Sequence, residues 1–315
     1  MDIALHVDKL YKVYGKDKEE VTALDHITVD FPDNTICGLL GSNGAGKTTL
    51  IKCAVGLLEP TDGRILRGEE DITKNASERL KHVSVVLDGG RNLFGYMTVK
   101  ENIRYFSLLR GKNIKNDQPY IQDILNYMGI EDIYNRCIQF LSFGMRQRAS
   151  IAVALACRSD IIFMDEPTTG LDINYQDELA QLILKLKEKY RCTIIPSSHN
   201  MQFIDNVCSD CVLIEKGKLI HSGKIDEFKY SFALDDYLIT CRQSLTNEQL
   251  ARLQDRIKIK EYDHEKKALE VLWQNSENFC DLITMLQKEE IDVYSVEKIG
   301  GLAAAVANMT KGQEE

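Results

Sequence analysis

The sequence predicts an α/β fold with a mostly parallel sheet, followed by a smaller α+β domain. Short apolar strands alternate with helical segments as far as residue 228, which is typical of βαβ units. A glycine-rich stretch joins a buried strand to a helix near residue 41. Beyond residue 230 the expected order of elements becomes β-α-β-β-α-β, which suggests a ferredoxin-like sandwich.

The first sixty residues contain three expected strands and one helix. Leu5–Val7 and Ile27–Val29 alternate apolar and polar residues with a period of two, which indicates strands. Ile36–Leu40 is a continuous apolar run, which indicates a buried strand. Leu50–Leu58 is expected to be a helix that begins on the threonines before it.

The middle of the chain, at about 92–158, is expected to form a helical subdomain. Its helices are predicted at Val99–Arg110, Gln118–Met128 and Phe143–Cys157. Strands return afterwards, and the helix Gln176–Tyr190 separates the first two of them. These strands are expected at Ile161–Met164, Thr193–Ile195 and Cys211–Ile214.

The pattern changes again after Phe228. Helices are expected at Asn247–Leu253 and Ser276–Glu289, among four strands. The strands are expected at Asp236–Cys241, Ile257–Tyr262, Leu269–Trp273 and Val293–Ile299. We therefore expect two domains, 1–230 and 231–315, in agreement with the length of 315 residues at about 150 residues per domain.

Charge and hydropathy exclude several classes of protein. The net charge of −9 disfavours a general nucleic-acid binder, so no nucleic-acid partner is expected. The longest apolar run, Ile151–Cys157, is far shorter than the roughly 20 residues of a membrane-spanning helix. The start of the chain, Met1–Leu5, carries an acid and lacks the apolar region of a secretory signal. We therefore expect a cytoplasmic protein that does not itself cross a membrane.

The cysteines are expected to be reduced and mostly buried. There are nine, an odd number, and they are scattered along the chain. Cys208 and Cys211 have the spacing of metal ligands, but a zinc site needs a second pair, and no matching pair follows. Packing is the favoured interpretation of this pair, with redox or metal chemistry as the alternative.

A phosphate-binding loop is predicted between the third strand and the helix that follows it. Gly41, Gly46, Lys47 and Thr48 fit the pattern G-x-x-x-x-G-K-[ST]. Glycines let the backbone curl so that N–H groups point at phosphate oxygens, and the lysine adds a positive charge for the β- and γ-phosphates. The threonine hydroxyl can ligate Mg²⁺, and the helix offers its positive N-terminal end. The candidate nucleotide-binding residues here are Gly41, Ser42, Asn43, Gly44, Ala45, Gly46, Lys47, Thr48 and Thr49.

A second, acidic motif supports this interpretation. The apolar strand that begins at Ile161 ends in two carboxylates, Asp165 and Glu166. We expect Asp165 to hold Mg²⁺ together with Thr48. Glu166 would polarise a water molecule for attack on the γ-phosphate.

Between these motifs, Leu141–Arg148 resembles the signature motif of ATP-binding cassette (ABC) ATPases, usually L-S-G-G-Q followed by a basic residue and Q-R. Further elements of that family follow the expected order, and the resemblance covers residues 1 to about 230. Tyr14 resembles the aromatic residue that stacks on adenine, and Asp88 falls where a glutamine loop is expected. The other matching positions are Pro167 after the acidic motif, Gly170–Asp172 as the D-loop, and His199 as the switch histidine.

The resemblance implies a P-loop ABC ATPase core with a helical subdomain, and ATP and Mg²⁺ as cofactors. In the family, ATP is bound between two cassettes, so a second cassette is an expected partner and a homodimer the expected active unit. Lys47 of one chain and Ser142 and Gly144 of the other would contact the same nucleotide, with Asp172 nearby. Ser142 can also cap the helix that begins at about Phe143. The catalytic residues would be Lys47, Glu166, His199 and Asp88.

The chain departs from the family pattern at three positions. Phe143 replaces the first signature glycine, Met145 replaces the signature glutamine, and Asp88 replaces the loop glutamine. An aspartate can still ligate Mg²⁺ or orient water, but it is shorter and charged. We expect ATP hydrolysis to persist, with altered coupling geometry and rate.

The resemblance also implies a separate transmembrane permease subunit as partner and a place on the cytoplasmic face of the cell membrane. A cytoplasmic helix of that partner would dock near Asp88–Met97. The run Gly89–Phe94 and the extra C-terminal domain resemble bacterial drug and antibiotic exporters, which favours export, although importers share the other motifs. The C-terminal domain would assist dimerisation or regulation, or be an inert appendage. Two alternatives stay open, namely an ABC ATPase that acts on a soluble macromolecule and a degenerate cassette that only clamps ATP.

Overall fold

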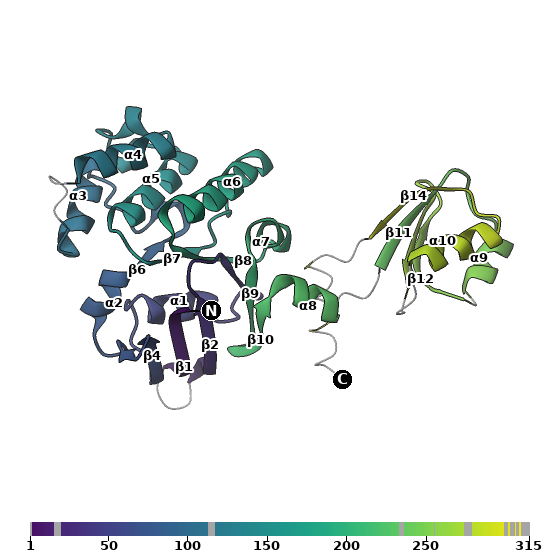
Figure 1. Ribbon diagram of the computed structural model, residues 1–315, viewed down its shortest axis with the longest axis horizontal. Helices are drawn as coiled ribbons and strands as arrows, with labels where there is room; N and C mark the ends of the chain where they lie inside the picture. The colour runs from purple at the N-terminus through teal and green to yellow at the C-terminus, as the bar shows by residue number, and fades with distance from the viewer. Residues whose placement is uncertain are drawn as a thin grey trace. The chain divides into compact units, whose positions relative to one another are not determined.

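The chain forms two compact units, residues 1–224 and 225–315, in the computed structural model (Figure 1). The boundary near 230 that the sequence predicts lies within helix α8 (Ile225–Phe232), which belongs to the second unit. The structure describes residues 2–15, 20–112, 117–232, 236–254, 256–273 and 279–298, and the single positions 302, 306 and 309. Within those residues, no helix has both the length and the apolar character that a membrane span requires.

A six-stranded sheet forms the centre of the first unit. Its strand order is β10-β9-β3-β8-β7-β6, and the strands are parallel except for β10, which pairs antiparallel with β9. Their bounds are β3 (Cys37–Leu40), β6 (Val83–Val86), β7 (Ile161–Asp165), β8 (Thr193–Ser198), β9 (Asp210–Glu215) and β10 (Lys218–Lys224). The predicted parallel sheet is thus confirmed. Because its strands are parallel, the loops that follow β3, β6, β7 and β8 all leave from the same edge.

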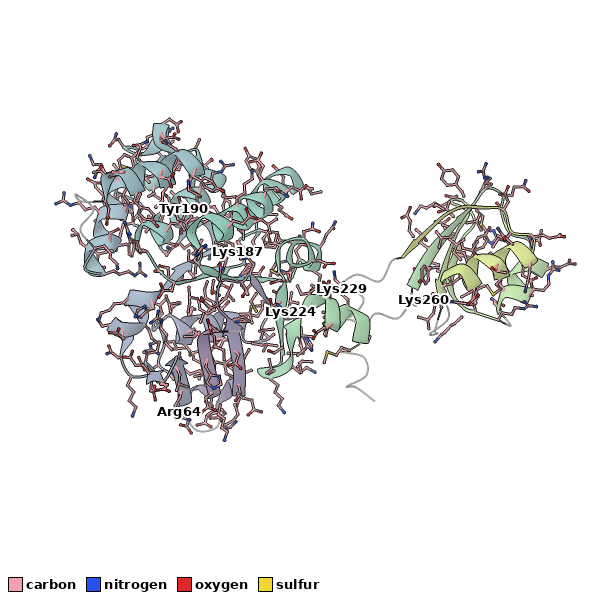
Figure 2. All side chains as sticks on the ribbon, in the orientation of Figure 1. Arg64, Lys187, Tyr190, Lys224, Lys229 and Lys260 are labelled. Atoms are coloured by element: carbon pink, nitrogen blue, oxygen red, sulfur yellow. The ribbon has the colours of Figure 1, made fainter. Side chains whose placement is uncertain are left out.

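A second, antiparallel sheet lies in the same unit, in the order β2-β1-β4-β5. It contains β1 (Ile3–Tyr14), β2 (Val21–Pro32), β4 (Asp62–Arg67) and β5 (Glu70–Asp71). The strands expected at Leu5–Val7 and Ile27–Val29 are therefore parts of longer strands. On the surface of this sheet, Arg64 on β4, labelled in Figure 2, pairs with Asp8 on β1 at 2.6 Å.

The core of this unit joins the two sheets through α1 (Lys47–Ala54). Leu50 and Ile51 of α1 belong to one buried cluster together with Leu5 of β1 and Phe163 of β7. Helix α1 packs against both β2 and β7. Burial of this apolar face fixes the start of α1, and with it Lys47 and Thr48, against the end of β3.

The predicted helical subdomain is present beside β6 and β7 (Figure 1). Thr98 and Glu101 form a capping box at the start of α3, and Gly129 ends α4 in a left-handed conformation. After α1, the described helices of the first unit are α2 (Ala76–His82), α3 (Val99–Leu109), α4 (Gln118–Met128), α5 (Phe143–Ala156), α6 (Ile173–Tyr190) and α7 (Met201–Val207). Among the described residues, short 3₁₀ turns lie between them at η2 (Asp88–Gly90), η3 (Glu131–Ile133) and η4 (Ile138–Phe140).

The second unit has the predicted β-α-β-β-α-β order after α8. Its sheet is antiparallel with the order β12-β13-β11-β14, which is the strand order of a ferredoxin-like sandwich. Trp273 and residues of both helices share its buried core. The elements are β11 (Asp236–Cys241), α9 (Asn247–Gln254), β12 (Lys258–Asp263), β13 (Ala268–Leu272), α10 (Phe279–Lys288) and β14 (Val293–Lys298). The first three residues of the predicted helix Ser276–Glu289 lie outside the described residues.

Candidate functional site

The loop after β3 wraps around the side chain of Lys47. Lys47 is only 5 % exposed, and its Nζ donates to the carbonyl oxygens of Gly41 at 2.8 Å and Ser42 at 3.1 Å. The amide N–H of Ala45 donates to Ser42 O at 3.1 Å, which closes the turn. Asn43 and Gly44 are exposed at its tip. The loop therefore holds a cation at the N terminus of α1, the arrangement that binds phosphate groups.

Glu166 lies between Lys47 and His199, the other two predicted catalytic residues beside the phosphate-binding loop. Its Oε1 is 3.5 Å from Lys47 Nζ, and its Oε2 is 2.8 Å from His199 Nδ1. Glu166 follows β7 and His199 follows β8, so the parallel sheet brings together residues 33 positions apart. Glu166 adopts a left-handed backbone conformation with φ of 47°, which is uncommon for a non-glycine residue and often marks a functional site. The carboxylate is thus positioned beside the phosphate-binding loop.

Thr48 and Asp165 form the second part of this site. The Thr48 hydroxyl lies 3.2 and 3.1 Å from the two carboxylate oxygens of Asp165. The buried hydroxyl of Ser197, on β8, donates to Asp165 Oδ1 at 2.8 Å and accepts from the Glu166 amide N–H at 3.0 Å. Hydroxyl and carboxylate oxygens are the ligands that Mg²⁺ prefers, so Thr48 and Asp165 fit that ion. Mg²⁺ usually keeps several waters and needs few protein ligands.

Asp88 lies at the same edge of the sheet, in the turn η2 after β6, the strand next to β7. Its Oδ2 is 3.5 Å from Arg91, while Oδ1 is buried and has no hydrogen-bond partner among the described residues. The described residues contain no cluster of three or more His, Cys, Asp or Glu side chains suited to a metal ion. Asp88 is therefore near the site by topology but is not part of a carboxylate cluster there.

The two tyrosines of β1 have different surroundings. Tyr14 is 41 % exposed, and its hydroxyl lies 3.5 Å from the Thr49 hydroxyl at the start of α1. Lys12 Nζ is 5.6 Å from the centre of the Tyr14 ring. Tyr11 instead stacks on His26, with ring centres 4.7 Å apart. Tyr14 is therefore the tyrosine whose ring is near the phosphate-binding loop and open to an adenine base.

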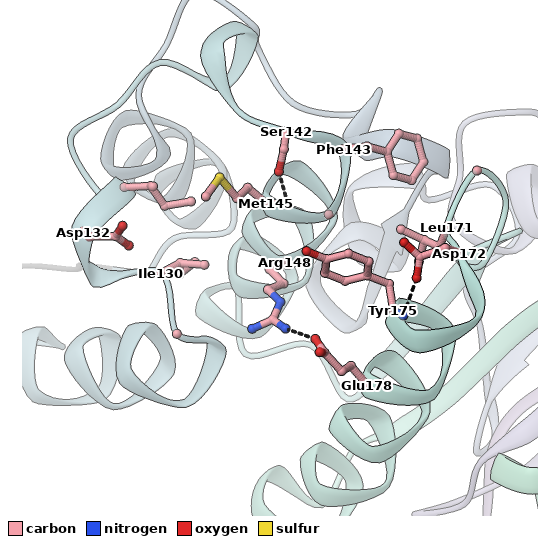
Figure 3. A pocket seen from close by; sticks show the side chains of 14 residues that line it. Ile130, Asp132, Ser142, Phe143, Met145, Arg148, Leu171, Asp172, Tyr175 and Glu178 are labelled. Atoms are coloured by element: carbon pink, nitrogen blue, oxygen red, sulfur yellow. Dashed lines mark hydrogen bonds and ion pairs between the residues drawn. The ribbon is translucent and has the colours of Figure 1, made fainter.

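The signature residues line a separate pocket of about 450 Å³ (Figure 3). Ser142 caps α5 by accepting from the Met145 amide at 3.3 Å, as predicted, and Asp172 caps α6 by accepting from the Tyr175 amide at 3.1 Å. A Cβ at Gly144 would be 3.9 Å from the Tyr175 ring, which is ordinary contact. No residue of the loop 41–49 lines this pocket. One chain therefore holds two separate parts of the predicted site.

Two contacts of the site escaped the sequence analysis. Glu215, at the end of β9, accepts from the Ser42 hydroxyl at 2.8 Å and from its amide at 3.3 Å, and so holds the phosphate-binding loop from the side opposite β8. The bond from Ser197 to Asp165 also went unpredicted. Glu215 gives no local signal, because a carboxylate after an apolar strand is also typical of an ordinary solvent-exposed strand end.

The pair Cys208 and Cys211 lies in the core. Both side chains are buried near Cys37 on β3, whose neighbour Gly38 pairs with Cys211. Burial raises the pKa of the Cys208 thiol well above its ordinary value, and the same holds for the pKa of Cys37. Protonated, buried thiols agree with the packing interpretation.

The comparisons with known proteins agree with this geometry. The family described as "ABC transporter" matches residues 24–169. The ABC transporter ATP-binding protein NatA of Bacillus subtilis is 36 % identical over 219 residues, which cover 70 % of this chain and 89 % of NatA. The methionine import ATP-binding protein MetN of Aliivibrio fischeri is 29 % identical over 259 residues, 80 % of this chain and 75 % of MetN.

Solved structures show the same fold. A dimeric ATP-binding cassette in a post-hydrolysis state, bound to ADP and Pi, has a TM-score of 0.62 at 23 % identity, over 70 % of this chain and 98 % of that cassette. The cbiO1 protein of Clostridium perfringens has a TM-score of 0.63 at 23 % identity, over 81 % of this chain and all of cbiO1.

The chain belongs to the ATP-binding subunits of the ABC transporter family. It is an ABC ATPase, which binds and hydrolyses ATP, and proteins of this family dimerise and work with transmembrane partners. The resemblance in the signature motif is thereby confirmed at the level of the family.

Proposed function

We propose that the chain hydrolyses ATP at the site around Lys47, Glu166 and His199, and that this drives a separate membrane-spanning permease. The observation that carries the proposal is the position of Glu166, whose carboxylate lies between Lys47 at 3.5 Å and His199 at 2.8 Å. A carboxylate at this place can accept a proton from a water molecule that attacks the γ-phosphate. His199, more than half exposed, holds that water from the other side.

The other residues bind and orient the nucleotide. The amides of residues 41–49 and Lys47 bind the phosphates, and the Tyr14 ring stacks on the adenine. Thr48 and Asp165 would hold Mg²⁺, and the ion would supply positive charge that neutralises the negative charge developing on the phosphates. Asp88, near the same edge, orients water or reaches the ion, in place of the glutamine usual in the family.

The active unit is a dimer of cassettes, most simply a homodimer. Ser142, Gly144 and Asp172 of one chain complete the nucleotide site of the other. The separation of the signature pocket from the phosphate-binding loop within one chain supports this arrangement. The helix α5, capped by Ser142, offers its positive N-terminal end to the γ-phosphate.

The permease docks on the helical subdomain near Asp88–Met97, with the chain held at the cytoplasmic face of the membrane. Apolar and aromatic side chains are exposed to solvent in this region. Tyr96 is 87 % exposed, and the Phe94 ring packs edge-on against Tyr105 with ring centres 5.0 Å apart. Leu108 and Leu109 of α3 are exposed as well. A surface of this kind is typical of a protein contact.

Export is the proposed direction of transport, and the stretch Gly89–Phe94, which resembles the corresponding loop of drug and antibiotic exporters, supports it. Import is the second candidate, because MetN is named a methionine importer and matches over 80 % of this chain. The C-terminal domain would assist dimerisation or regulation. Transport of labelled substrate into or out of vesicles that contain the chain and its permease distinguishes the two directions.

The test of the function uses Glu166→Gln, with Glu188→Gln on the exposed face of α6 as the matched control. We expect Glu166→Gln to bind ATP with unchanged affinity and to lose at least a hundredfold in turnover, while the control keeps both. The variant is then captured with ATP from detergent-solubilised membranes, and a stoichiometric polytopic partner is expected. Capture of ribosomes or DNA, or unchanged turnover, would contradict the proposal.

A further inference from the structure

The ring of Phe143 fills the space between two glycine turns. A Cβ built on Gly89 would lie 2.8 Å from Phe143 Cε2, closer than real Cβ atoms approach a neighbour. A Cβ on Gly170 would lie 3.6 Å from Phe143 Cζ, in van der Waals contact. Figure 3 shows Phe143 pointing to the side of Leu171 and Asp172, whereas Met145 points the other way, toward Asp132. The ring thus lies against the Gly89 turn and close to the Gly170 turn, about 80 residues further along the sequence.

Arg146, one turn further along α5, also contacts the Gly89 turn. Its Nε donates to Gly89 O at 3.3 Å, and Nη1 donates to Leu141 O at 3.0 Å. Its guanidinium carbon lies 5.9 Å from the centre of the Phe143 ring, within the range of a cation–π contact. A Cβ on Gly90 would be 3.1 Å from the Arg146 carbonyl oxygen. The turn η2 is therefore fitted to the start of α5 at both of its glycines.

The parts that meet at Phe143 all adjoin residues to which the proposed function gives a role at a nucleotide site. Asp88 directly precedes Gly89, Asp172 follows Gly170 by two residues, and Ser142 directly precedes the ring itself. A glycine at position 143, the residue usual in the family, would have no side chain to touch either turn. Close-packed side chains transmit small shifts because they cannot be compressed.

We propose that Phe143 is a positioning residue for ATP hydrolysis, which holds the Asp88 turn and the Gly170 turn in a fixed relation to the start of α5. This inference rests on the proposed function, in which Asp88 and Ser142 act on the nucleotide. In this role Phe143 would act through the two turns, without itself contacting ATP or the attacking water. Its ring makes contacts that a signature glycine cannot make. The absence of a side chain at Gly89 leaves room for this ring, and Gly90 does the same for Arg146.

The first experiment compares Phe143→Ala and Phe143→Leu in the full chain. Amide hydrogen exchange without nucleotide is expected to rise at least tenfold in residues 88–94 and 168–172 of Phe143→Ala, and to stay unchanged in the phosphate-binding loop. The kcat for ATP is expected to fall by about 10- to 100-fold with KM within about twofold, since the defect is one of geometry. Phe143→Leu keeps an apolar side chain and should therefore retain most of the exchange protection in the two loops and most of the kcat. Unchanged exchange in the two loops, or loosened loops with unchanged kcat, would overturn the proposal.

The second experiment tests the contact directly. Gly89→Ala places a methyl group against the ring, whereas Gly68→Ala adds the same group at nearly the same φ, 59° against 60°, with nothing within 4 Å. Gly89→Ala should lower kcat at least tenfold and Gly68→Ala should not. In the Phe143→Ala background, Gly89→Ala should add less than a twofold loss. An equal loss in both backgrounds would show that the ring is not the cause.

Two further variants distinguish an error in the proposed function from an error in the role given to Phe143. If Asp88→Asn and Ser142→Ala leave kcat unchanged, the roles given to those residues are wrong, whatever the exchange of the loops. If those variants lose activity while Phe143→Ala alters neither exchange nor kcat, the function stands and the role of Phe143 is refuted.

Discussion

Gly41 lies where the phosphate-binding loop meets the neighbouring strand β9. A Cβ at this position would be 2.2 Å from the carbonyl oxygen of Ile214, whereas carbon and oxygen in close contact are about 3.3 Å apart. An alanine would therefore force the loop away from β9 by about 1 Å. Gly44, at the tip of the same loop, has φ of 85° and nothing within 4 Å of its Cβ position.

Alanine at Gly44 would add backbone strain alone, whereas alanine at Gly41 would add both backbone strain and a steric clash. A residue other than glycine in a left-handed conformation costs about 1–3 kcal/mol at either site. The displacement of about 1 Å affects Gly41→Ala alone, and a shift of that size in a binding site can cost about a hundredfold, or about 2.7 kcal/mol. We expect Gly41→Ala to lower the free energy of unfolding by about 3 kcal/mol and Gly44→Ala by about 1 kcal/mol.

Urea unfolding of both variants without nucleotide measures the stability difference, and titration with a fluorescent ATP analogue measures the affinity. Gly41→Ala should bind the analogue at least a hundredfold more weakly than the wild-type chain. The reasoning is refuted if the two variants lose the same stability and Gly41→Ala keeps its affinity, because then the Ile214 carbonyl does not constrain the loop.

Three further predictions concern other parts of the molecule. Tyr14→Ala should weaken ATP binding at least tenfold, and Tyr11→Ala should leave it unchanged. The reason is that the Tyr11 ring already stacks on His26, whereas the Tyr14 ring is open to the adenine; equilibrium binding of ATP measures both affinities. The pKa of Glu101 is lowered by hydrogen bonds from Thr98, so its stabilisation is present above the ordinary carboxyl range and lost as the pH falls through the lowered value. The stability gap between the wild-type chain and Glu101→Gln, from urea unfolding, should therefore shrink in acid, and a constant gap would contradict it. Because burial raises their pKa, six thiols should resist iodoacetamide in the native protein and react in urea, as mapped by mass spectrometry: Cys37, Cys53, Cys157, Cys192, Cys208 and Cys241.

The sequence was informative wherever the chemistry is local. The run Ile36–Leu40 followed by glycines and Lys47 predicted a strand, a loop and a helix, and all three are present. The same holds for the Ser142 cap of α5, because a cap depends only on the residues within one turn. The first two strands were predicted too short, because their ends alternate less clearly and are stabilised by pairing with each other.

The sequence by itself determined the class of the fold, the phosphate-binding loop and the acidic motif, since each depends on a short run of residues with its own signal. Only the tertiary structure decided which side chains meet. Three contacts join strands and loops that are far apart in the sequence. His199 lies beside Glu166, Glu215 accepts hydrogen bonds from Ser42, and Phe143 packs against Gly89. Such contacts depend on the strand order of the sheet and on the shape of the packed core, and no local pattern encodes either of these.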